Sequence, residues 1–385
     1  MDISQNVRYI GVNDYATDLF EGQYPCPNGM AYNSYVILDN KIAVMDGVDN
    51  AVSGKWLQNL ARVLQNRTPD YLILHHVEPD HSGSILQFLN AYQNAKIVAT
   101  KQAFVILQNY FPVDLQARSV VVSDNDTLCL GQRTLRFFIA PMVHWPEVAF
   151  SYEQTEKILF SADAFGKFGT TSLQDEWAEE ASRYYFNIVG KFGVQVQNAL
   201  KKLSALEISA ICPLHGRVLK EETATAIALY GVWSRYQAER SGVVIAYTSV
   251  YGNTKKAVEL LQRILQENGQ EVQTFDLARC DTSKALAQAF RLDRLVLAST
   301  TYNGGVFPVM RHFLAELKEH NFQNRKVGFI ENGSWSPFAQ KVMRESLESC
   351  RNLNFCNQNV RIVSALNTDS QNQIYSLAKE LCNNF

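Results

Sequence analysis

The stretch "YLILHHVEPDHSGS" (residues 71–84) places histidines and carboxylates directly after an apolar run. Residues 71–74 predict a buried strand, and the positions that follow, 75–81, hold three histidines, one glutamate and one aspartate. Imidazole and carboxylate side chains are ligands for metal ions. The stretch therefore predicts a metal-binding loop at the mouth of a strand.

The spacing within this loop suits two neighbouring metal ions. Side chains alternate sides along an extended segment, so His76, Glu78 and Asp80 are expected to share a face. His81 follows where Pro79 and the "HSG" turn break the alternation. One loop can thus offer His76 and Glu78 to one ion, and Asp80 and His81 to a second.

One loop cannot complete the coordination shells of two ions, so further ligands are needed. Three candidates lie beside other predicted strand ends. They are His144 in "PMVHWPE", Asp163 in "LFSADAFG" and His215 in "ICPLHGR". A carboxylate has two oxygens, so Asp163 could bridge both ions. Four histidines and three carboxylates around two divalent ions leave about one positive charge, which suits a bound hydroxide or a reduced-oxygen ligand.

Composition describes an ordinary globular chain of two or three domains. It has 385 residues, of which 46% are hydrophobic and 19% charged, and a formal net charge of −2. Such a charge predicts neither nucleic acid nor an anionic membrane as a partner. We see no signal-peptide pattern at the start and no apolar run of the ~18 residues that span a bilayer.

Seven cysteines occur at irregular spacing, and no Cys-x-x-Cys pair is present. This pattern argues against a structural zinc site, a rubredoxin-type iron site and a thioredoxin motif. Scattered reduced thiols in a cytoplasmic protein are the expected state.

The second part of the chain shows the alternation of an α/β fold. Buried, non-alternating strand patterns such as "GVVIAYTS" (242–249), "DRLVLAST" (293–300) and "RKVGFIENG" (325–333) are separated by helical patterns such as 253–268. Five strand–helix units of this kind predict a doubly wound parallel sheet. We expect this domain to span 241–385.

The first part, 1–240, is richer in strands. Patterns such as "SYVILD", "KIAVMDGV", "AKIVAT", "LRFFIA" and "KILFSAD" predict strands, with helices between some of them at 53–67 and 83–94. A mixed α+β or αββα layered domain fits this order. Residues 177–206 predict one long helical segment.

A phosphate-binding loop is predicted at "YTSVYGNTKKA" (247–257), between an apolar strand and a helix. Its hydroxyl and amide side chains supply donors, Gly252 lets the backbone curl, and the helix N-terminus adds free N–H groups. The loop matches neither Gly-x-x-x-x-Gly-Lys-Ser/Thr nor Gly-x-Gly-x-x-Gly, which argues against a nucleoside triphosphatase and a dinucleotide site.

The Thr-x-x-x-Gly-Asn-Thr form of this loop resembles that of flavodoxins, which bind FMN. Two more loops, "STTYNGG" (299–305) and "ENGSWSP" (331–337), follow the third and fourth strands, where a doubly wound fold binds its ligand. Tyr302 and Trp335 either contact the isoalloxazine ring or pack in the core, and Tyr251 either covers the phosphate or packs. The flavin-binding residues implied are Thr248, Ser249, Val250, Tyr251, Gly252, Asn253, Thr254, Ser299, Thr300, Thr301, Tyr302, Asn303, Gly304, Asn332, Gly333, Ser334 and Trp335.

The pattern His-x-Glu-x-Asp-His resembles that of the flavodiiron proteins, or A-type flavoproteins. They share the metallo-β-lactamase fold with hydrolases that typically carry histidine where Glu78 stands here and bind zinc. A carboxylate at this position shifts the metal preference toward iron or manganese. The resemblance implies one iron bound by His76, Glu78 and His144, another bound by Asp80, His81 and His215, and a bridging Asp163.

This resemblance spans residues 1–385, with an N-terminal metallo-β-lactamase-like αββα sandwich followed by a flavodoxin-like sheet. It implies an FMN-dependent diiron oxidoreductase that reduces O₂ to water with four electrons, NO to N₂O, or both. It further implies a separate electron donor, such as rubredoxin or a flavoprotein reductase, and a head-to-tail homodimer or homotetramer. The loop "FEGQYPCPNG" (20–29) lacks the histidine that some members carry.

Two other functions stay open at this point. A zinc hydrolase of metallo-β-lactamase type could be fused to a flavodoxin-like domain, although Glu78 argues against zinc. A pure electron carrier would use the first domain only for docking, which leaves the seven candidate ligands without a role. Metal analysis separates these functions. Iron is expected for the diiron oxidoreductase, zinc for the hydrolase, and little of either for the electron carrier.

Overall fold

The computed structural model describes residues 3–383. The chain divides into two compact units, of which the first ends at Gly231 and the second begins at Val232. The boundary expected from the sequence, at 240/241, falls inside the second unit. The intervening residues pack on that unit through Glu239, whose carboxylate accepts hydrogen bonds from Arg291 at 2.8 and 2.9 Å.

The first unit contains a six-stranded mixed sheet with the order β1-β6-β7-β8-β9-β10. Neighbours from β1 to β7 are antiparallel, and those from β7 to β10 are parallel. The strands are β1 (Val7–Tyr9), β6 (Tyr35–Ile37), β7 (Ala43–Met45), β8 (Tyr71–Ile73), β9 (Lys96–Thr100) and β10 (Ser119–Val122), and the helices beside them are η1 (Asn50–Val52), α1 (Ser53–Leu64), α2 (Pro79–Ser82), α3 (Ile85–Ala91), α4 (Lys101–Tyr110) and η2 (Gln116–Arg118).

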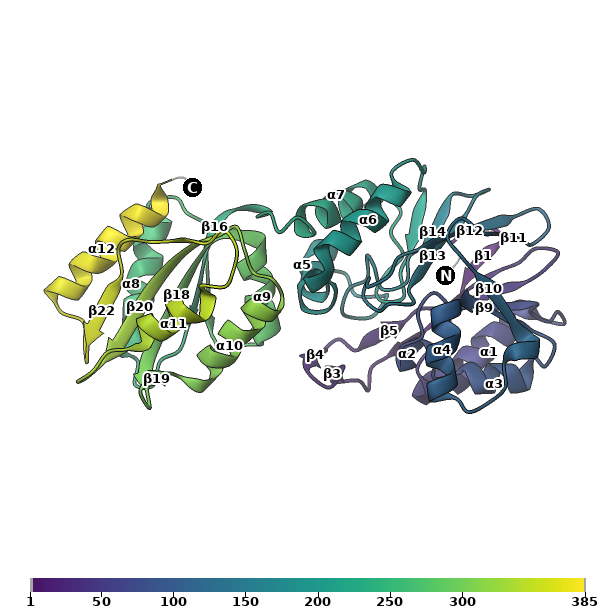
Figure 1. Ribbon diagram of the computed structural model, residues 1–385, viewed down its shortest axis with the longest axis horizontal. Coiled ribbons are helices and arrows are strands. Elements are labelled where there is room, and N and C mark those ends of the chain that lie inside the picture. The colour runs from purple at the N-terminus through teal and green to yellow at the C-terminus, as the bar shows by residue number, and fades with distance from the viewer. Residues whose placement is uncertain (1–2, 384–385) are drawn as a thin grey trace. The chain divides into compact units, whose positions relative to one another are not determined.

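A second, five-stranded sheet has the order β11-β12-β13-β14-β15 and is antiparallel except for β14 and β15. Its strands are β11 (Thr127–Cys129), β12 (Thr134–Ile139), β13 (Ala149–Glu153), β14 (Ile158–Phe160) and β15 (Ala210–Cys212). Figure 1 shows α5 (Trp177–Tyr184), α6 (Gly193–Leu203) and α7 (Thr223–Trp233) beside this sheet. Two small ribbons pair β2 (Val12–Asp14) with β5 (Met30–Tyr32), and β3 (Leu19–Phe20) with β4 (Tyr24–Pro25).

The two sheets pack face to face around one hydrophobic core. Tyr35, Met45 and Ile73 from the first sheet share this core with Phe137 and Phe160 from the second, and all are nearly inaccessible to solvent. With helices on the outside, this arrangement confirms the predicted αββα sandwich.

The segment 177–206 is helical but not one helix. Between α5 and α6 the chain forms a π-helical turn at Tyr185–Val189 and a 3₁₀ turn at Gly190–Phe192. Within this stretch the carbonyl of Asn187 accepts a hydrogen bond from the Tyr24 hydroxyl at 3.0 Å. The predicted long helical segment is therefore present, but its geometry changes from α to π and 3₁₀ and back to α.

The second unit is the predicted doubly wound parallel sheet, with the order β17-β16-β18-β20-β21. This order, in which the first strand lies between the second and third, is that of flavodoxin-like folds. The strands are β16 (Arg240–Tyr247), β17 (Val272–Asp276), β18 (Leu292–Tyr302), β20 (Lys326–Gly333), β21 (Asn354–Phe355) and β22 (Val360–Val363), which pairs with β20; β19 (Gly305–Val306) runs antiparallel to β18.

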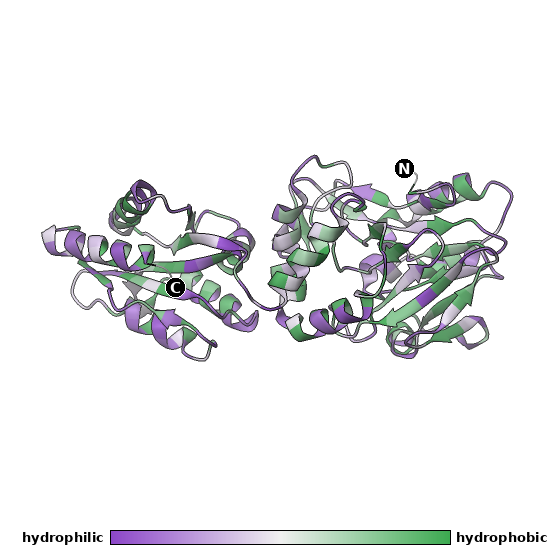
Figure 2. Ribbon diagram, turned by 90° about the horizontal axis from the view of Figure 1, so that it is seen from above, coloured by the Kyte–Doolittle hydropathy of each residue, from purple (hydrophilic) through white to green (hydrophobic). Residues whose placement is uncertain are grey.

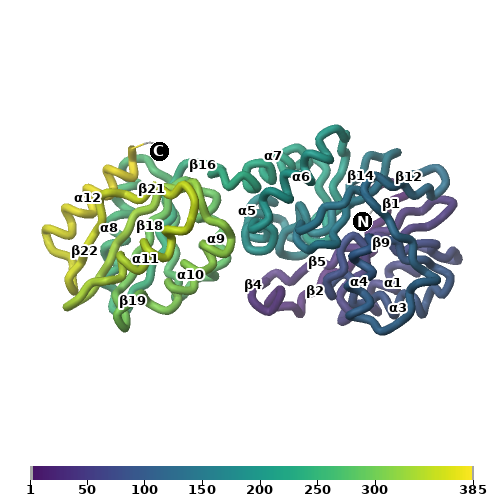
Figure 3. Tube along the Cα trace, viewed as in Figure 1, coloured from purple at the N-terminus to yellow at the C-terminus, as the bar shows by residue number. Residues whose placement is uncertain are grey.

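Helices cover both faces of this sheet. α8 (Asn253–Glu267) and α12 (Thr368–Cys382) lie on one side, and α9 (Thr282–Arg291), α10 (Pro308–Glu319) and α11 (Ala339–Leu347) on the other (Figure 3). Figure 2 shows hydrophobic residues along the strands and hydrophilic ones on outer helix faces. Among residues 3–383, no helix combines the length and the apolar character that crossing a bilayer requires.

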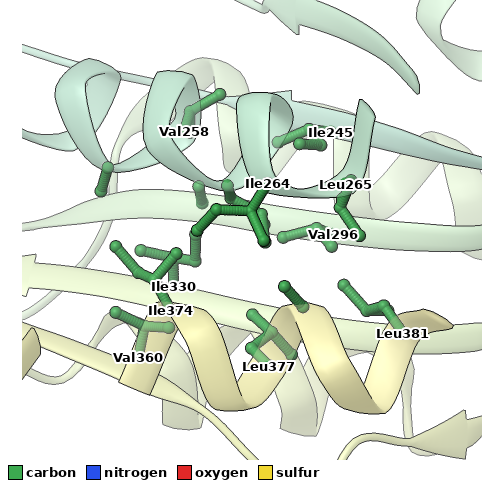
Figure 4. Packing of buried hydrophobic residues seen from close by; sticks show 14 of the residues in the cluster. Ile245, Val258, Ile264, Leu265, Val296, Ile330, Val360, Ile374, Leu377 and Leu381 are labelled. Atoms are coloured by element: carbon green, nitrogen blue, oxygen red, sulfur yellow. The ribbon is translucent and has the colours of Figure 1, made fainter. Parts of the chain in front are cut away.

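The core under α8 and α12 holds this unit together. Figure 4 shows Ile264 and Leu265 of α8 and Leu377 of α12 pointing into one apolar layer against Val296 and Ile330 of the strands. Burying side chains of this size contributes about 1.5–3 kcal/mol each. The spacing of apolar residues along each helix turns one stripe toward the sheet.

Leu377→Ala should therefore lower the free energy of unfolding of the second unit by about 2–5 kcal/mol, because it leaves a cavity in a core that is fully buried. Urea denaturation followed by circular dichroism measures this. Tyr375→Ala, on the exposed side of the same helix, is the control and should change it by less than about 0.5 kcal/mol. Equal effects from both variants would contradict the packing described.

Candidate metal centre and flavin pocket

Four of the predicted ligands lie on one short segment at the carboxyl end of β8. His76 follows the strand, Glu78 precedes the helical turn α2, and Asp80 and His81 lie within that turn. Pro79 occupies the first position of the turn, where its fixed φ angle suits a helix and its missing N–H is not needed. The turn, rather than strand alternation, separates Asp80 from His76 and Glu78, so the expected shared face is wrong for Asp80.

The other three predicted ligands come from the second sheet. His144 lies in the connection between β12 and β13, Asp163 follows β14, and His215 follows β15. Because β14 and β15 are parallel neighbours, the residues after them emerge at the same edge of the sheet. The face-to-face packing of the sheets brings this edge to the segment after β8.

The first group that could hold a metal ion consists of His76, Glu78, His144 and Asp163, whose ligand atoms all lie within 4.8 Å of one another. Nε2 of His144 is 3.0 Å from Oδ2 of Asp163 and 3.2 Å from Oε2 of Glu78. Nε2 of His76 is 3.1 Å from the same Glu78 oxygen. Two imidazole nitrogens and two carboxylate oxygens thus converge on one point.

The second group consists of Asp80, His81 and His215. Nε2 of His81 and Nε2 of His215 each lie 3.3 Å from Oδ2 of Asp80. Oδ1 of Asp163 lies 3.2 Å from the His81 nitrogen and 3.5 Å from the His215 nitrogen. The two oxygens of Asp163 therefore face the two groups, one each.

Several of these atoms lack the partners that burial normally demands. Both oxygens of Asp80, Oδ1 of Asp163 and Nε2 of His81 and His215 are buried and have no hydrogen-bond partner in the described part of the chain. Buried polar atoms without partners are rare and costly, so these atoms fit bound ions. Imidazoles and carboxylates without a thiolate fit iron or manganese.

Without metal, protons hold this cluster together. Burial opposes protonation of His144, but hydrogen bonds to Asp163 and Glu78 outweigh it and raise the pKa of His144 to about 9. Burial alone would raise the pKa of Glu78, yet hydrogen bonds from His144 and His76 lower it to about 2. The pKa of Asp163 is likewise held well below its usual range, against its burial, by the same histidines.

The second unit contains a cavity of ≈ 680 Å³ at the carboxyl ends of its strands. The loop after β16 and the start of α8 form one wall, and Gly252 adopts a left-handed φ of 86° at the helix N-terminus. The hydroxyl of Thr300 is buried at this cavity without a partner among residues 3–383. None of the lining residues carries a formal charge. Hydroxyls, amides and a helix N-terminus fit a phosphate group.

Most of the predicted flavin residues line this cavity. Thr248, Gly252 and Ser299 do not; the hydroxyls of Thr248 and Ser299 lie 3.0 Å apart beneath it. Tyr302 is 44% and Trp335 91% exposed, so the alternative of core packing is wrong for both. Tyr251, 92% exposed, also lines the cavity rather than a core.

Comparison with known proteins gives the same two parts. Residues 30–216 match a family model described as ODP family beta lactamase, and residues 244–358 match one described as flavodoxin domain. A nitric oxide reductase of Moorella thermoacetica is 28% identical over 91% of this chain and 90% of its own length. An anaerobic nitric oxide reductase flavorubredoxin of Aeromonas hydrophila is 28% identical over 87% of this chain and 70% of its own.

Solved structures agree along the whole chain. Rubredoxin oxygen:oxidoreductase from Desulfovibrio gigas superposes with a TM-score of 0.92 at 25% identity, covering 99% of this chain and 97% of that one. The flavodiiron protein from Giardia intestinalis gives a TM-score of 0.91 at 26% identity, covering 98% and 96%. This chain belongs to the flavodiiron proteins.

Two groups that contact the ligand histidines of this flavodiiron protein were not predicted from the sequence. Oε1 of Glu147 lies 2.7 Å from Nδ1 of His76, and the carbonyl of Ala31 accepts a hydrogen bond from Nδ1 of His215 at 2.8 Å. His75 lies next to His76 in the chain but contacts Asp46 and Ser151 rather than the ligands. In the sequence, Glu147 could have been noticed as a residue near the metal centre because it lies three residues after the predicted ligand His144.

Other missed residues surround the two sites. The ring of Tyr184 lies 5.5 Å from that of His215, and its buried hydroxyl has no partner among the described residues. Burial and the charges of Asp163 and Asp80 hold the pKa of Tyr184 well above its usual value. At the flavin cavity the additional lining residues are Ser336, Phe338 and Ser364. Ser336 lies within the predicted loop at 331–337, Phe338 directly follows that loop, and Ser364 follows β22.

Metal affinity should depend on pH, because a metal ion needs a neutral imidazole and displaces the proton of His144. Since the pKa of His144 in the metal-free protein is raised to about 9, affinity should fall by about tenfold per pH unit below that value. Anaerobic calorimetric titration with ferrous iron in buffers of different ionisation heat measures both affinity and released protons.

The control for this titration is His312→Gln, which removes an exposed imidazole outside both metal groups and should leave the pH dependence intact. Affinity that stays constant between pH 6 and 9, with no proton released, would be inconsistent with the protonated cluster.

Asn253→Ala combined with Thr254→Ala should weaken FMN binding, because both side chains line the cavity at the start of α8. Loss of hydrogen bonds to a charged group suggests a change of about tenfold or more in dissociation constant. Flavin fluorescence quenching measures this, and iron content should stay unchanged. The control is Lys255→Ala, because the Lys255 side chain approaches Glu259 at 3.8 Å rather than the cavity, and it should leave FMN affinity nearly intact. An equal loss of FMN affinity in both variants would contradict a phosphate site built from uncharged groups.

Proposed function

We propose that this flavodiiron protein reduces O₂ to water, NO to N₂O, or both, with FMN in the second unit and two iron ions in the first. The observation that carries the proposal is the placement of Asp163, whose two carboxylate oxygens face two separate groups of ligands. A shared carboxylate is the arrangement by which two metal ions are held side by side to bind one small substrate.

The residues proposed for each ion follow from the geometry of the two groups. One iron would bind His76, Glu78 and His144, the other would bind Asp80, His81 and His215, and Asp163 would bridge. When bound, reduced FMN and two ferrous ions together supply up to four electrons, which is the number that reduces O₂ to two waters; coupling two NO molecules to N₂O and water takes two.

The protein's own contribution is a dry and orienting site. His76, His81 and His215 are inaccessible to solvent, and the ring of Phe20 lies 5.1 Å from that of His215. The hydroxyl of Tyr184 offers a hydrogen-bond donor beside the centre. Buried ligands hold their geometry, and the absence of bulk water near them limits side reactions.

A zinc hydrolase fused to a flavodoxin-like domain has less support. Oε2 of Glu78 points at the same position as Nε2 of His76 and His144, so a carboxylate completes the group where a zinc hydrolase would use imidazole. The matched relatives are named as nitric oxide reductases, and a solved one as an oxygen oxidoreductase. These names support redox chemistry.

We expect electrons to arrive from a separate donor protein, such as rubredoxin or a flavoprotein reductase. We also expect the chain to form a head-to-tail homodimer or homotetramer and to act in the cytoplasm. The printed name of the Desulfovibrio gigas protein includes rubredoxin, which supports the first donor. Reduced thiols within the described residues include Cys129, Cys212, Cys280, Cys350, Cys356 and Cys382, which suits a reducing compartment.

Gas consumption by the anaerobically reduced, iron- and FMN-loaded protein tests the proposal. Offered O₂ and NO in separate runs, it should consume at least one rapidly, with water or N₂O as the product, and the faster gas identifies the substrate. Asp163→Ala should lose iron and activity together, because the shared ligand is gone. Uptake of neither gas by fully loaded protein would overturn the proposal.

A further inference from the structure

The imidazoles of the metal centre differ in what their second ring nitrogen meets. Nδ1 of His76 lies 2.7 Å from Oε1 of Glu147. Nδ1 of His215 lies 2.8 Å from the carbonyl oxygen of Ala31, and Nδ1 of His81 has no hydrogen-bond partner within residues 3–383. Of these three rings, only that of His76 has a carboxylate next to its Nδ1.

Glu147 is buried, and no cationic side chain of the described chain neutralises it except His76. The side chains of both residues are 0% exposed. Oε1 of Glu147 also accepts the backbone N–H of Val77 at 3.1 Å, whereas Oε2 is buried without a partner among the residues described. A buried carboxylate is costly unless positive charge lies close to it. A metal ion bound to His76 would supply that charge through the ring.

The fold, rather than the metal, fixes this contact. The hydroxyl of Thr100 at the end of β9 donates to the carbonyl of Glu147 at 3.0 Å. The N–H of Ala149 donates to the carbonyl of His75 at 3.0 Å, which fastens the loop to the end of β8. The ring of Trp145 meets that of His76 edge to face at 5.2 Å. Glu147 and His76 are thus held from both sheets before any ion binds.

The two metal positions also differ in the negative charge around them. Glu78 and one oxygen of Asp163 belong to the first position, and Asp80 and the other oxygen of Asp163 to the second. Glu147 adds a further carboxylate only behind His76 of the first. The remaining contacts described at the second position, such as the carbonyl of Ala31, are neutral.

We propose that Glu147 is a positioning residue that makes the two metal positions unequal. It keeps a proton on Nδ1 of His76, so Nε2 is the ligand atom, and its charge strengthens electron donation by that ring. The ion bound by His76, Glu78 and His144 is therefore held more tightly, and its ferric state is more favoured, than it would be without Glu147. This inference rests on the diiron function proposed above.

Glu147→Gln is the direct test, because it removes the charge and keeps the length of the side chain. The full chain is loaded with FMN and ⁵⁷Fe, and Mössbauer spectroscopy during a redox titration follows the two ions separately. One ion should lose about 10–100-fold in affinity. Its ferric-to-ferrous ratio at fixed potential should fall about tenfold, which is about 59 mV for one electron, while the other ion is unchanged.

Glu153→Gln is the matched control. Glu153 is also fully buried, lies at the far end of β13, and accepts backbone N–H groups of Thr155 and Glu156. Its replacement removes a buried carboxylate at the far end of the strand that follows Glu147, without contact to a ligand, so both ions should keep their spectra and affinities. A shift in Glu153→Gln equal to that in Glu147→Gln would overturn the inference.

The remaining outcomes separate this inference from the proposed function. Wild-type protein that cannot retain two irons would overturn both. Two-iron wild-type protein with an unaltered Glu147→Gln variant, or with both ions weakened equally, would overturn only the inference. If Glu147→Gln does not fold, Glu147→Asp replaces it, because it keeps the charge and lengthens the contact; a smaller shift of the same ion supports the inference, and no shift overturns it.

Discussion

The first unit depends on the burial of one carboxylate. Asp163 is 1% exposed, and its oxygens lie 3.0–3.6 Å from ring nitrogens of His76, His81, His144 and His215. A charge so deeply buried is tolerated only when opposite charge surrounds it, whether from protons on the rings or from metal ions. The histidines come from both sheets, so this requirement is met only when the two sheets pack face to face.

Much of this architecture could be predicted, because apolar runs and helical spacing mark the elements that bury surface. The strand "YLILHH" and the unit that contains β16 and α8 were evident from local pattern alone. The change of helical geometry between α5 and α6 was not evident, and Tyr24, a residue distant in sequence, donates a hydrogen bond to the carbonyl of Asn187 within it. Contacts across the chain override local propensity in such cases.

The candidate site shows the same division between local and distant information. His76, Glu78, Asp80 and His81 could be grouped because they share one loop. The predicted division, with His76 and Glu78 in one group and Asp80 and His81 in the other, agrees with the structure. Alternation nevertheless placed Asp80 on the wrong face, because the turn α2 reorients it. Glu147 was overlooked because a carboxylate in a loop is usually solvated, and only the fold shows that it is buried behind a ligand.

The two sites deal with charge in opposite ways. The metal centre concentrates carboxylates and imidazoles in a buried place, so its state is tied to protons and metal ions. The flavin cavity has no charged lining residue and offers hydroxyls, amides and the start of α8. Dipoles fixed by the backbone do not titrate, so the lining of this cavity keeps its charge state as pH changes. A phosphate-binding loop built on histidine would add its own titration to flavin binding near neutral pH, and this uncharged loop adds none.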